Sequence, residues 1–399
     1  MTQRPLFLQH IAQTSPNPIG IEADRAEGIY IYDRAGRRYT DLIAGVAVSN
    51  VGHCHPKVVA AVQAQAARYM HLMVYGEYIQ SPQVLFAQAL ASVLPAPLDC
   101  VYFVNSGAEA NEGALKLAKR YTGRTEIVAF RNAYHGGTHG ALSATGNEEL
   151  RNAFRPLLPD IRYLTFNAFD DLPQITERTA CVLVEPIQGE AGVRLPAAGF
   201  LQALQARCRD TGALLAFDEV QTGFGRTGAW FAAIRYGVTP DIITLAKAMG
   251  GGMPLGAFVA SRSIMETLQS RPALGHITTF GGHPVSCAAA LAAWQVLHDE
   301  NRLSEVEGKA ALFRRLLQHP AIREIRGEGL MLAAELADAA MLRPAVAALL
   351  QQGIITEWFL FCDTAFRIAP PLIISHEEIS DACRTICDVL TRITNACRT

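Results

Sequence analysis

Several features that mark common classes of protein are missing from this chain. Its nine cysteines include no Cys-x-x-Cys pair, so neither a zinc site of paired cysteines nor a dithiol redox motif is indicated, and such scattered thiols are typical of a reducing compartment. No apolar run is long enough to span a bilayer, and the first residues, Met-Thr-Gln-Arg-Pro, have no signal-peptide core. The sequence therefore predicts a cytoplasmic protein with no membrane partner.

An excess of charge of one sign is lacking too. The 35 Lys and Arg residues nearly balance the 37 Asp and Glu residues, and without a basic stripe no nucleic-acid partner is expected. The run His53-Cys54-His55 lies in a turn before a helix and has no matching ligand pair elsewhere, so we expect no metal site. No phosphate-binding run of the G-x-x-x-x-G-K-[ST] type is present either.

Short apolar runs alternate with amphipathic segments through the middle of the chain. The runs are nearly uninterrupted, as in strands that are covered on both faces of a parallel sheet. The amphipathic segments repeat apolar residues every three or four positions, as helices with one buried stripe do. This alternation predicts an α/β three-layer sandwich with a mainly parallel central sheet. The predicted strands are residues 101–104, 127–130, 181–184, 214–217, 242–245 and 257–260, and the stripes are Val58, Val62, Ala66 and Tyr69, then Ala110, Ala114, Leu117 and Tyr121.

The pattern changes near residue 290. A long Ala- and Leu-rich helix is followed by shorter strand signals at 330–336, 353–356 and 365–369 and by a terminal helix from Glu377. The first 45 residues have strand signals of their own, at 28–32 and 38–41. We therefore expect a large domain of residues 46–290, a smaller α+β domain of residues 291–399, and an N-terminal segment, 1–45, that packs against the small domain.

Polar residues follow five of the predicted strands. In an open parallel sheet, ligands bind outside the carboxyl ends of the strands, so these residues are expected to share one cleft. This concentration is the main evidence from the residues themselves for an enzyme. The groups are Asn105 to Glu112, Arg131 to Gly137, Glu185 to Glu190, Asp218 to Gln221, and Ala246 with Lys247.

Lys247 is the most informative of them, because a lysine at the end of a buried strand must be desolvated, paired or neutral. A desolvated lysine has a lowered pKa and forms Schiff bases with aldehydes; the alternative is a lysine whose ammonium reaches water. Ser106, Gly107 and Ala108 open a helix whose free amides suit a phosphate, or they form a plain helix cap.

Two further residues have alternative interpretations. Asp218 ends an apolar strand and needs a partner, either a protonated ring nitrogen or an arginine such as Arg226. Tyr134 either stacks on an aromatic ligand or packs as a half-buried side chain. A G-x-G-x-x-G run at 223–228 neither follows its strand directly nor opens a clear helix, which argues against a dinucleotide site.

A lysine, a phosphate cradle, an aspartate and a stacking aromatic together indicate pyridoxal 5'-phosphate. The sequence resembles the class III aminotransferases, the fold-type I group that includes acetylornithine, ornithine and 4-aminobutyrate aminotransferases. The resemblance covers nearly the whole chain. Its most specific motifs are Asn-Ser-Gly-Ala-Glu-Ala-Asn-Glu at 105–112, Glu-Pro-Ile-Gln-Gly-Glu at 185–190, Asp-Glu-Val-Gln-Thr-Gly-Phe-Gly-Arg-Thr-Gly at 218–228, and the segment around Lys247.

The resemblance implies roles in binding the cofactor. Lys247 would hold the cofactor covalently and, once released, move a proton between the substrate carbon and the cofactor. Asp218 would keep the pyridine nitrogen protonated, which makes the ring an electron sink. The remaining contacts would be Tyr134 and Val220 on the ring faces, Gln221 at the ring hydroxyl, Ser106, Gly107 and Ala108 at the phosphate, and Thr279 at the phosphate of the neighbouring subunit in a homodimer.

The resemblance also implies how substrates bind. Arg367 would bind a substrate carboxylate through a bidentate fork. Glu190 would pair with Arg367 and move away when glutamate or 2-oxoglutarate needs that arginine. Two positions depart from relatives: His283 stands where many members have Asn, and Val46 stands where ornithine aminotransferases have a tyrosine. The second departure favours a donor with a neutral tail, such as N-acetylornithine or 4-aminobutyrate.

The expected activity is transfer of an amino group from a terminal-amine donor to 2-oxoglutarate, giving an aldehyde and glutamate. Four alternatives remain: an aminotransferase for 4-aminobutyrate or another ω-amino acid, an aminomutase or decarboxylating transaminase on the same cofactor, a non-catalytic cofactor-binding regulator, and a nicotinamide enzyme. The expected pairing of Arg367 with Glu190 favours ordinary glutamate chemistry, and no DNA-binding extension is expected beside the enzyme-like domains.

Overall fold

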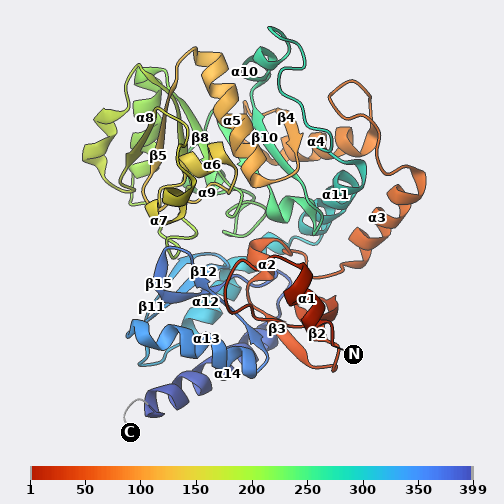
Figure 1. The fold of residues 1–399 in the computed structure, drawn as a ribbon, viewed down its shortest axis with the longest axis vertical. Coiled ribbons are helices and arrows are strands. Elements are labelled where there is room, and N and C mark those ends of the chain that lie inside the picture. Colours follow the sequence, from red (N-terminus) through yellow and green to blue (C-terminus); the bar gives the residue numbers. More distant parts are fainter. Residues whose placement is uncertain (1, 397–399) are drawn as a thin grey trace.

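The computed structural model describes residues 2–396, and a seven-stranded sheet lies at the centre of its larger part (Figure 1). The strand order is β4-β10-β9-β8-β7-β5-β6, and β10 alone runs antiparallel to its neighbours. All six predicted strands are present, and the mainly parallel sheet is confirmed. The strands are β4 Cys100–Val104, β5 Glu126–Phe130, β6 Ile161–Leu164, β7 Thr179–Val184, β8 Leu214–Asp218, β9 Ile242–Leu245 and β10 Gly256–Ala260.

Successive side chains of each central strand enter different cores, as the pleat of a strand requires. In β5, Ile127 and Ala129 pack in one cluster with helix α5, whereas Val128 and Phe130 pack in the other with α8 and α11. The sheet is therefore covered on both faces, and the three-layer sandwich is confirmed. The helices of this part are α3 Pro56–Arg68, α4 Ser81–Val93, α5 Gly107–Thr122, α6 His139–Ala144, α7 Glu148–Arg151, α8 Phe200–Thr211, α9 Ala232–Tyr236, α10 Arg262–Met265 and α11 Pro284–Asp299.

Two expectations about these elements need correction. Strand β6 is absent from the prediction because it is an edge strand, pairing with β5 only, and its sequence Ile-Arg-Tyr-Leu includes an exposed arginine. In α5 the predicted stripe is fully buried at Ala110, Ala114 and Leu117, but Tyr121, in the last turn, is 46% exposed.

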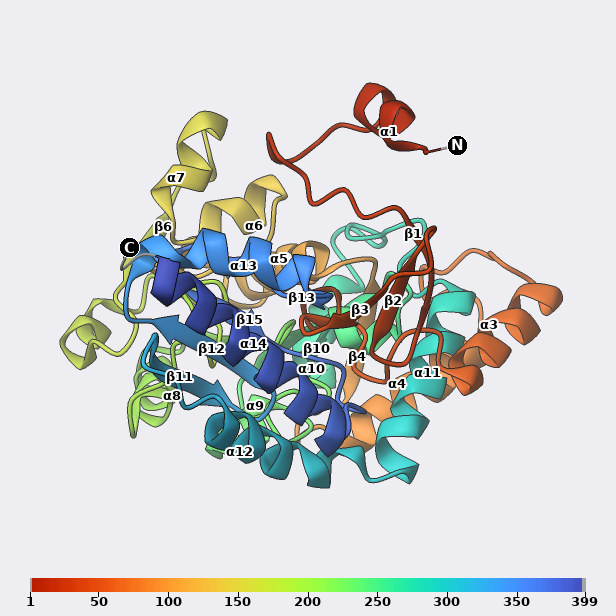
Figure 2. The ribbon, with the colours of Figure 1, turned by 90° about the horizontal axis from the view of Figure 1, so that it is seen from below.

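The remaining residues form two smaller sheets beside each other (Figures 1 and 2). The C-terminal sheet has the order β11-β12-β15-β14 and is antiparallel; the other is β1-β2-β3-β13, in which Thr40 of β3 pairs with Ile354 of β13. The elements are α1 Arg4–His10, β1 Ala23–Glu27, β2 Tyr30–Asp33, β3 Arg38–Asp41, α2 Ala44–Ala47, α12 Val306–Leu316, β11 Ile322–Glu328, β12 Met331–Leu336, α13 Leu342–Gln351, β13 Ile354–Ile355, β14 Trp358–Phe359, β15 Cys362–Ile368 and α14 His376–Ala396. The N-terminal strands thus join a strand from the C-terminal part.

The division into residues 1–45, 46–290 and 291–399 stays a prediction, and its second boundary falls inside α11, which is continuous to Asp299.

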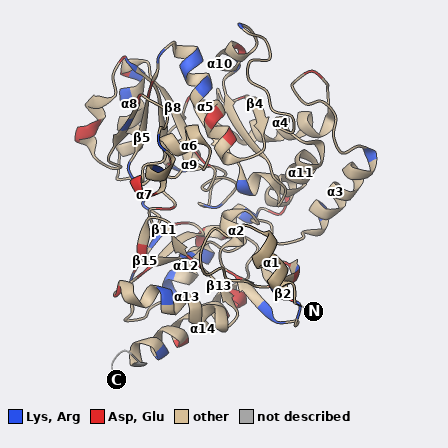
Figure 3. Ribbon diagram, in the orientation of Figure 1, with Lys and Arg blue, Asp and Glu red and all other residues tan. Residues whose placement is uncertain are grey.

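Charged residues of both signs are spread over the ribbon (Figure 3), so the electrostatics of any site depend on local side chains. Within residues 2–396 no helix combines the length and apolar character that a bilayer span requires.

Arg226 connects these parts of the chain. Its buried guanidinium donates from Nη1 to the carbonyl oxygens of Leu330 (2.9 Å) and Pro370 (2.6 Å) and from Nη2 to the Asn50 side chain. Asn50 in turn donates to the carbonyl of Phe224 at 2.8 Å. Burial lowers the pKa of Arg226 to about 9, with the charge of Asp41 opposing the shift. The arginine therefore joins the Asp218–Gly228 loop to Leu330 between β11 and β12, to Pro370 and to Asn50.

Candidate active site

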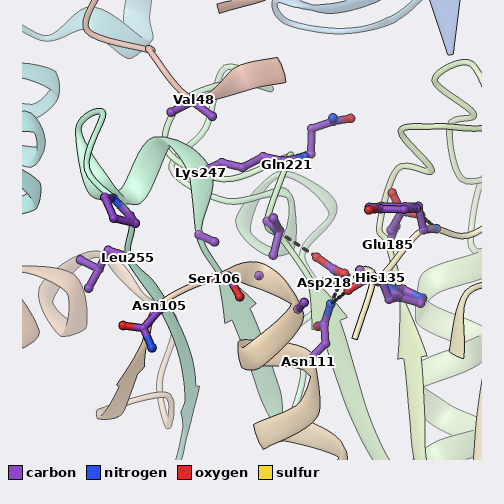
Figure 4. Close-up of a pocket in the computed structure, with 18 of the residues that line it drawn as sticks. Val48, Asn105, Ser106, Asn111, His135, Glu185, Asp218, Gln221, Lys247 and Leu255 are labelled. Atoms are coloured by element: carbon purple, nitrogen blue, oxygen red, sulfur yellow. Dashed lines mark hydrogen bonds and ion pairs between the residues drawn. The ribbon is translucent and has the colours of Figure 1, made fainter. Parts of the chain in front are cut away.

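A cavity of about 510 Å3 lies beyond the carboxyl ends of the parallel strands (Figure 4). Since β4, β5, β7, β8 and β9 point the same way, the residues after them meet at one edge of the sheet. The structure thus brings the five predicted polar groups into one cleft. Residues from each group line the cavity: Asn105, Ser106, Gly107, Ala108, Asn111, Tyr134, His135, Gly136, Gly137, Glu185, Glu190, Asp218, Val220, Gln221, Ala246 and Lys247.

Lys247 follows β9 and begins a short 3-10 helix, Lys247–Gly250, with a backbone φ of 51°. This left-handed conformation is costly for a residue with a Cβ, so the surrounding chain fixes the lysine here. The side chain lines the cavity and extends toward Gln221 (Figure 4). Burial lowers the pKa of the Lys247 ammonium, Glu190 opposes that shift and Arg367 adds to it. The amine therefore faces the cavity with a reduced affinity for its proton.

Asp218 is 5% exposed, and its carboxylate oxygens contact side-chain and backbone nitrogens. Its Oδ2 accepts from Asn111 Nδ2 and is paired with His135 Nδ1, both at 2.8 Å, and its Oδ1 accepts from the Val220 amide at 3.0 Å. An ion pair with Arg226, the alternative raised by the sequence, is wrong, because that guanidinium binds carbonyl oxygens elsewhere. Asp218 is thus an oriented acceptor on the cavity wall (Figure 4).

Asn111 and His135 have no role among the sequence-based expectations. Asn111 lies on α5, and besides Asp218 it binds the His135 carbonyl (2.8 Å) and accepts from Thr244 Oγ1 (2.7 Å). Both residues lie in predicted polar groups, 105–112 and 131–137, that also contain residues expected to contact the cofactor. The signal that could have identified them is the need of a buried carboxylate for donors.

The N-terminus of α5 opens into the cavity through Ser106, Gly107 and Ala108. Ser106 is the N-cap, and its Oγ accepts from the Glu109 amide at 3.2 Å, so capping and ligand binding are compatible. The first amides of a helix have no intrahelical acceptor. A Cβ on Gly107 would lie 2.9 Å from Val220 Cγ1. Glycine is therefore needed for the helix start to lie this close to Val220.

Burial raises the pKa of Glu185 to about 7, with His135 and the amides of Gly189 and Tyr134 opposing the shift. Its two oxygens accept from the amides of Tyr134 and Gly189, each at 2.9 Å. Tyr134 is half-buried and lines the cavity, and burial raises the pKa of its hydroxyl, with Glu190 adding to the shift. Glu185 therefore fixes the backbone beside the tyrosine.

Arg367 lies behind the cavity wall, 3% exposed. Its Nη2 donates to Glu190 Oε1 at 2.7 Å. With its amide oxygen turned toward the cations, Gln221 accepts from Arg367 Nη1 (3.0 Å) and from Lys247 Nζ (3.2 Å). Burial raises the pKa of Glu190, but the charges of Arg367 and Lys247 outweigh it, so this pKa lies below its usual range. The predicted contact between Glu190 and Arg367 is thus present, and Gln221 joins it to Lys247.

Two other predicted site residues lie outside the residues that line this cavity. Val46 is half-buried in α2, with a φ of 64°, and its near neighbour Val48 lines the cavity instead. Thr279 is exposed, and its carbonyl oxygen is 2.8 Å from His71 Nε2. Neither position contacts the cavity of its own chain in the part that the structure describes.

The residues present fit pyridoxal 5'-phosphate. An amine, Lys247, is available for an aldehyde; a carboxylate, Asp218, for a protonated ring nitrogen; and a helix N-terminus for a phosphate. Tyr134 and Val220 are available for the two faces of a ring. By contrast, in residues 2–396 no three His, Cys, Asp or Glu side chains gather as metal ligands would.

The family profile described as aminotransferase class-III matches residues 11–390. The acetylornithine aminotransferase of Methanocaldococcus jannaschii is 40% identical to this chain over 383 residues, which cover 92% of each chain. The enzyme of the same name from Bacillus subtilis is 39% identical over 373 residues, covering 91% of this chain and 93% of the relative.

Solved structures share the fold over almost the whole length. The ornithine aminotransferase of Toxoplasma gondii superposes with a TM-score of 0.91 at 31% identity, covering 98% of this chain and 95% of that one. The omega transaminase of Pseudomonas jessenii, solved in complex with PMP, gives a TM-score of 0.92 at 25% identity, covering 99% of each chain. The family profile and the solved structures thus match almost the same length of chain.

Proposed function

The chain belongs to the class-III aminotransferases, which depend on pyridoxal 5'-phosphate, and on that premise we propose that it transfers an amino group from a terminal-amine donor to 2-oxoglutarate. The products would be an aldehyde and glutamate. The observation that carries the proposal is the chain of contacts from Lys247 through Gln221 to the Arg367–Glu190 pair. These contacts connect the Lys247 amine to Arg367, which would bind a substrate carboxylate, and to Glu190, which would compete with that carboxylate for Arg367.

When bound, pyridoxal 5'-phosphate supplies an electron sink for the substrate carbon. Lys247 would hold it covalently and then carry the proton, a task for which a lowered amine pKa is suited. Asp218, oriented by Asn111 and His135, would keep the ring nitrogen protonated. Tyr134 and Val220 would hold the ring, Gln221 its hydroxyl, and Ser106, Gly107 and Ala108 its phosphate.

Arg367 would bind the carboxylate of glutamate or 2-oxoglutarate. A desolvated guanidinium binds a carboxylate strongly through two parallel hydrogen bonds, but Glu190 occupies its Nη2 at 2.7 Å. In one half-reaction Glu190 would stay and neutralise the arginine for a donor that presents only an amine. In the other it would move aside for the dicarboxylate.

The donor that we propose is N-acetylornithine or a molecule of similar shape. The residues that line the cavity include the apolar Val48, Met253, Pro254 and Leu255, and an uncharged tail fits apolar side chains better than a second ammonium does. Relatives named acetylornithine aminotransferase support this choice. We also propose a cytoplasmic homodimer in which Thr279 contacts the cofactor phosphate of the neighbouring subunit.

The donor can be tested by single half-reactions. We expect N-acetylornithine to convert the bound cofactor to its amine form with a kcat/KM at least about tenfold above that of ornithine, because a free ammonium would be desolvated against apolar side chains. The kcat/KM of each donor is measured from the change in cofactor absorbance after rapid mixing with a panel of amines that includes 4-aminobutyrate. A preference for ornithine would contradict the proposed donor, and no half-reaction with any amine would contradict the proposed function.

The carboxylate role is tested by Arg367→Lys. Lysine keeps the charge but cannot form the planar fork, and we expect the KM for glutamate to rise about 10- to 100-fold, as for the loss of one charge-assisted hydrogen bond. Steady-state kinetics measure the KM. The half-reaction with N-acetylornithine in the same variant is the control and should change less, since Glu190 would still neutralise the cation. Unchanged glutamate kinetics would refute the role of Arg367.

A further inference from the structure

Both members of the Glu190–Arg367 pair are bound by one short segment, residues 357–361. It includes β14 and the two-residue turn of Leu360 and Phe361 that leads into β15. None of these residues is predicted as a site residue from the sequence, and we call them the clamp segment. Because this one hairpin contacts both Glu190 and Arg367, its geometry affects how easily the two side chains separate.

On the Glu190 side, the turn binds the carboxylate directly. Glu190 Oε2 accepts from the Leu360 amide at 3.1 Å while Oε1 accepts from Arg367. The carbonyl oxygen of Glu190 also accepts from the Phe361 amide at 3.0 Å. To leave Arg367, the Glu190 carboxylate must therefore also give up the Leu360 amide, so that donor stabilises the paired state.

On the Arg367 side, the segment holds the guanidinium itself. Glu357 Oε1 is 3.3 Å from Arg367 Nε, and the guanidinium carbon lies 4.5 Å from the centre of the Phe359 ring. The Arg367 amide donates to the Glu357 carbonyl at 2.8 Å. Burial raises the pKa of Glu357, with Arg367 opposing the shift. These contacts involve Nε and the ring face, so they can persist when Glu190 leaves Nη2.

We propose that the clamp segment sets the equilibrium between the paired and the open Glu190–Arg367 arrangement, and thereby the affinity of the site for a substrate carboxylate. The inference rests on the proposed function, in which Arg367 binds that carboxylate. Two contacts of the clamp segment have opposite effects on the affinity for a substrate carboxylate. The Leu360 amide stabilises the paired state and so lowers that affinity. Glu357 holds Arg367 in position and so raises that affinity.

The first test removes one N–H group. Proline lacks the amide, and Leu360 is the first residue of its turn, outside the left-handed region and with a side chain that is 56% exposed, so Leu360→Pro is compatible with the turn. Leu360→Ala is the matched variant that keeps the amide. We expect Leu360→Pro to bind glutarate, a dicarboxylate that cannot react, about fivefold more tightly than Leu360→Ala does, as measured by calorimetry on the cofactor-loaded enzyme.

The second test concerns Glu357. We expect Glu357→Ala to weaken glutarate binding about three- to tenfold, because the guanidinium loses the contact that orients it. The contact is an ion pair rather than a hydrogen bond, since Arg367 Nε has no hydrogen-bond partner among the described residues; Glu357→Gln, which lacks the charge, should therefore bind glutarate as weakly as Glu357→Ala does. The proposal predicts that Leu360→Pro raises glutarate affinity and that Glu357→Ala lowers it. General damage to the hairpin would change the affinity in the same direction in both variants.

The outcomes separate the inference from the proposed function. If Arg367→Lys leaves glutarate binding unchanged, the carboxylate does not bind there and the proposed function fails. If Arg367→Lys weakens binding but Leu360→Pro equals Leu360→Ala, or both clamp variants shift affinity in the same direction, the clamp is refuted. Should Leu360→Pro fail to fold, Glu357→Ala decides alone: affinity equal to that of the unmodified enzyme overturns the proposal.

Discussion

Replacing Lys247 with alanine is expected to lower turnover by at least about 10³-fold, because general acid–base catalysis alone contributes about 10²–10⁴ and the covalent attachment of the cofactor would be lost as well. Gln221, whose amide oxygen lies 3.2 Å from the Lys247 amine, cannot accept and return a proton in its place. Alanine tolerates the φ of 51° no worse than lysine does, so the fold should persist. Initial rates with N-acetylornithine as the amino donor and 2-oxoglutarate as the acceptor measure the loss.

A second measurement is independent of turnover. Borohydride treatment should leave cofactor mass attached to the Lys247 peptide of the unmodified protein and to no peptide of Lys247→Ala. Lys57→Ala is the matched control, because Lys57 lies on the surface in an exposed pair with Glu300, and it should behave as the unmodified protein does. A Lys247→Ala enzyme that turns over at a normal rate would overturn the assignment of the site.

The sequence predicts the central sheet well because the buried strands leave a strong local signal. Residues 214–217 are all apolar, Thr244 alone interrupts the apolar run at 242–245, and both runs are strands covered on two faces. The position of Lys247 and Asp218 follows from this, since each residue ends or follows such a strand. Strand β6 leaves a weaker signal because an edge strand needs fewer apolar residues.

The contacts around the site are harder to predict because they join residues that are distant in the chain. Asn111 and Asp218 are 107 positions apart, and Leu360 and Glu190 are 170 apart. The Leu360 contact uses a backbone amide, which every residue except proline has, so no side chain marks it in the sequence. The alternative pairing of Asp218 with Arg226 is wrong for a related reason: both are buried, but Arg226 binds main-chain carbonyls that only the assembled fold brings to it.

Asp218→Asn is expected to lower kcat by at least about 10²-fold, the usual effect of removing one electrostatic contact to developing charge. Asparagine has the same shape, but it has no charge to hold a ring nitrogen in its protonated form. It also has one acceptor where Asp218 has two. If its oxygen faced Asn111 and His135, its NH2 group would face the Val220 amide, and two donors would meet. Cofactor affinity should therefore fall together with turnover.

Equilibrium dialysis measures that affinity, and thermal unfolding of the cofactor-free protein shows whether the variant still folds. Asp299→Asn provides a matched control, because Asp299 is paired with His298 on the surface and the substitution should change neither quantity. The charge, rather than the shape, explains the effect if Asp218→Glu recovers part of the activity that Asp218→Asn loses. Normal kcat and cofactor affinity in a folded Asp218→Asn enzyme would mean that the ring nitrogen is not held by this carboxylate, and the buried network of Asn111 and His135 would then need another purpose.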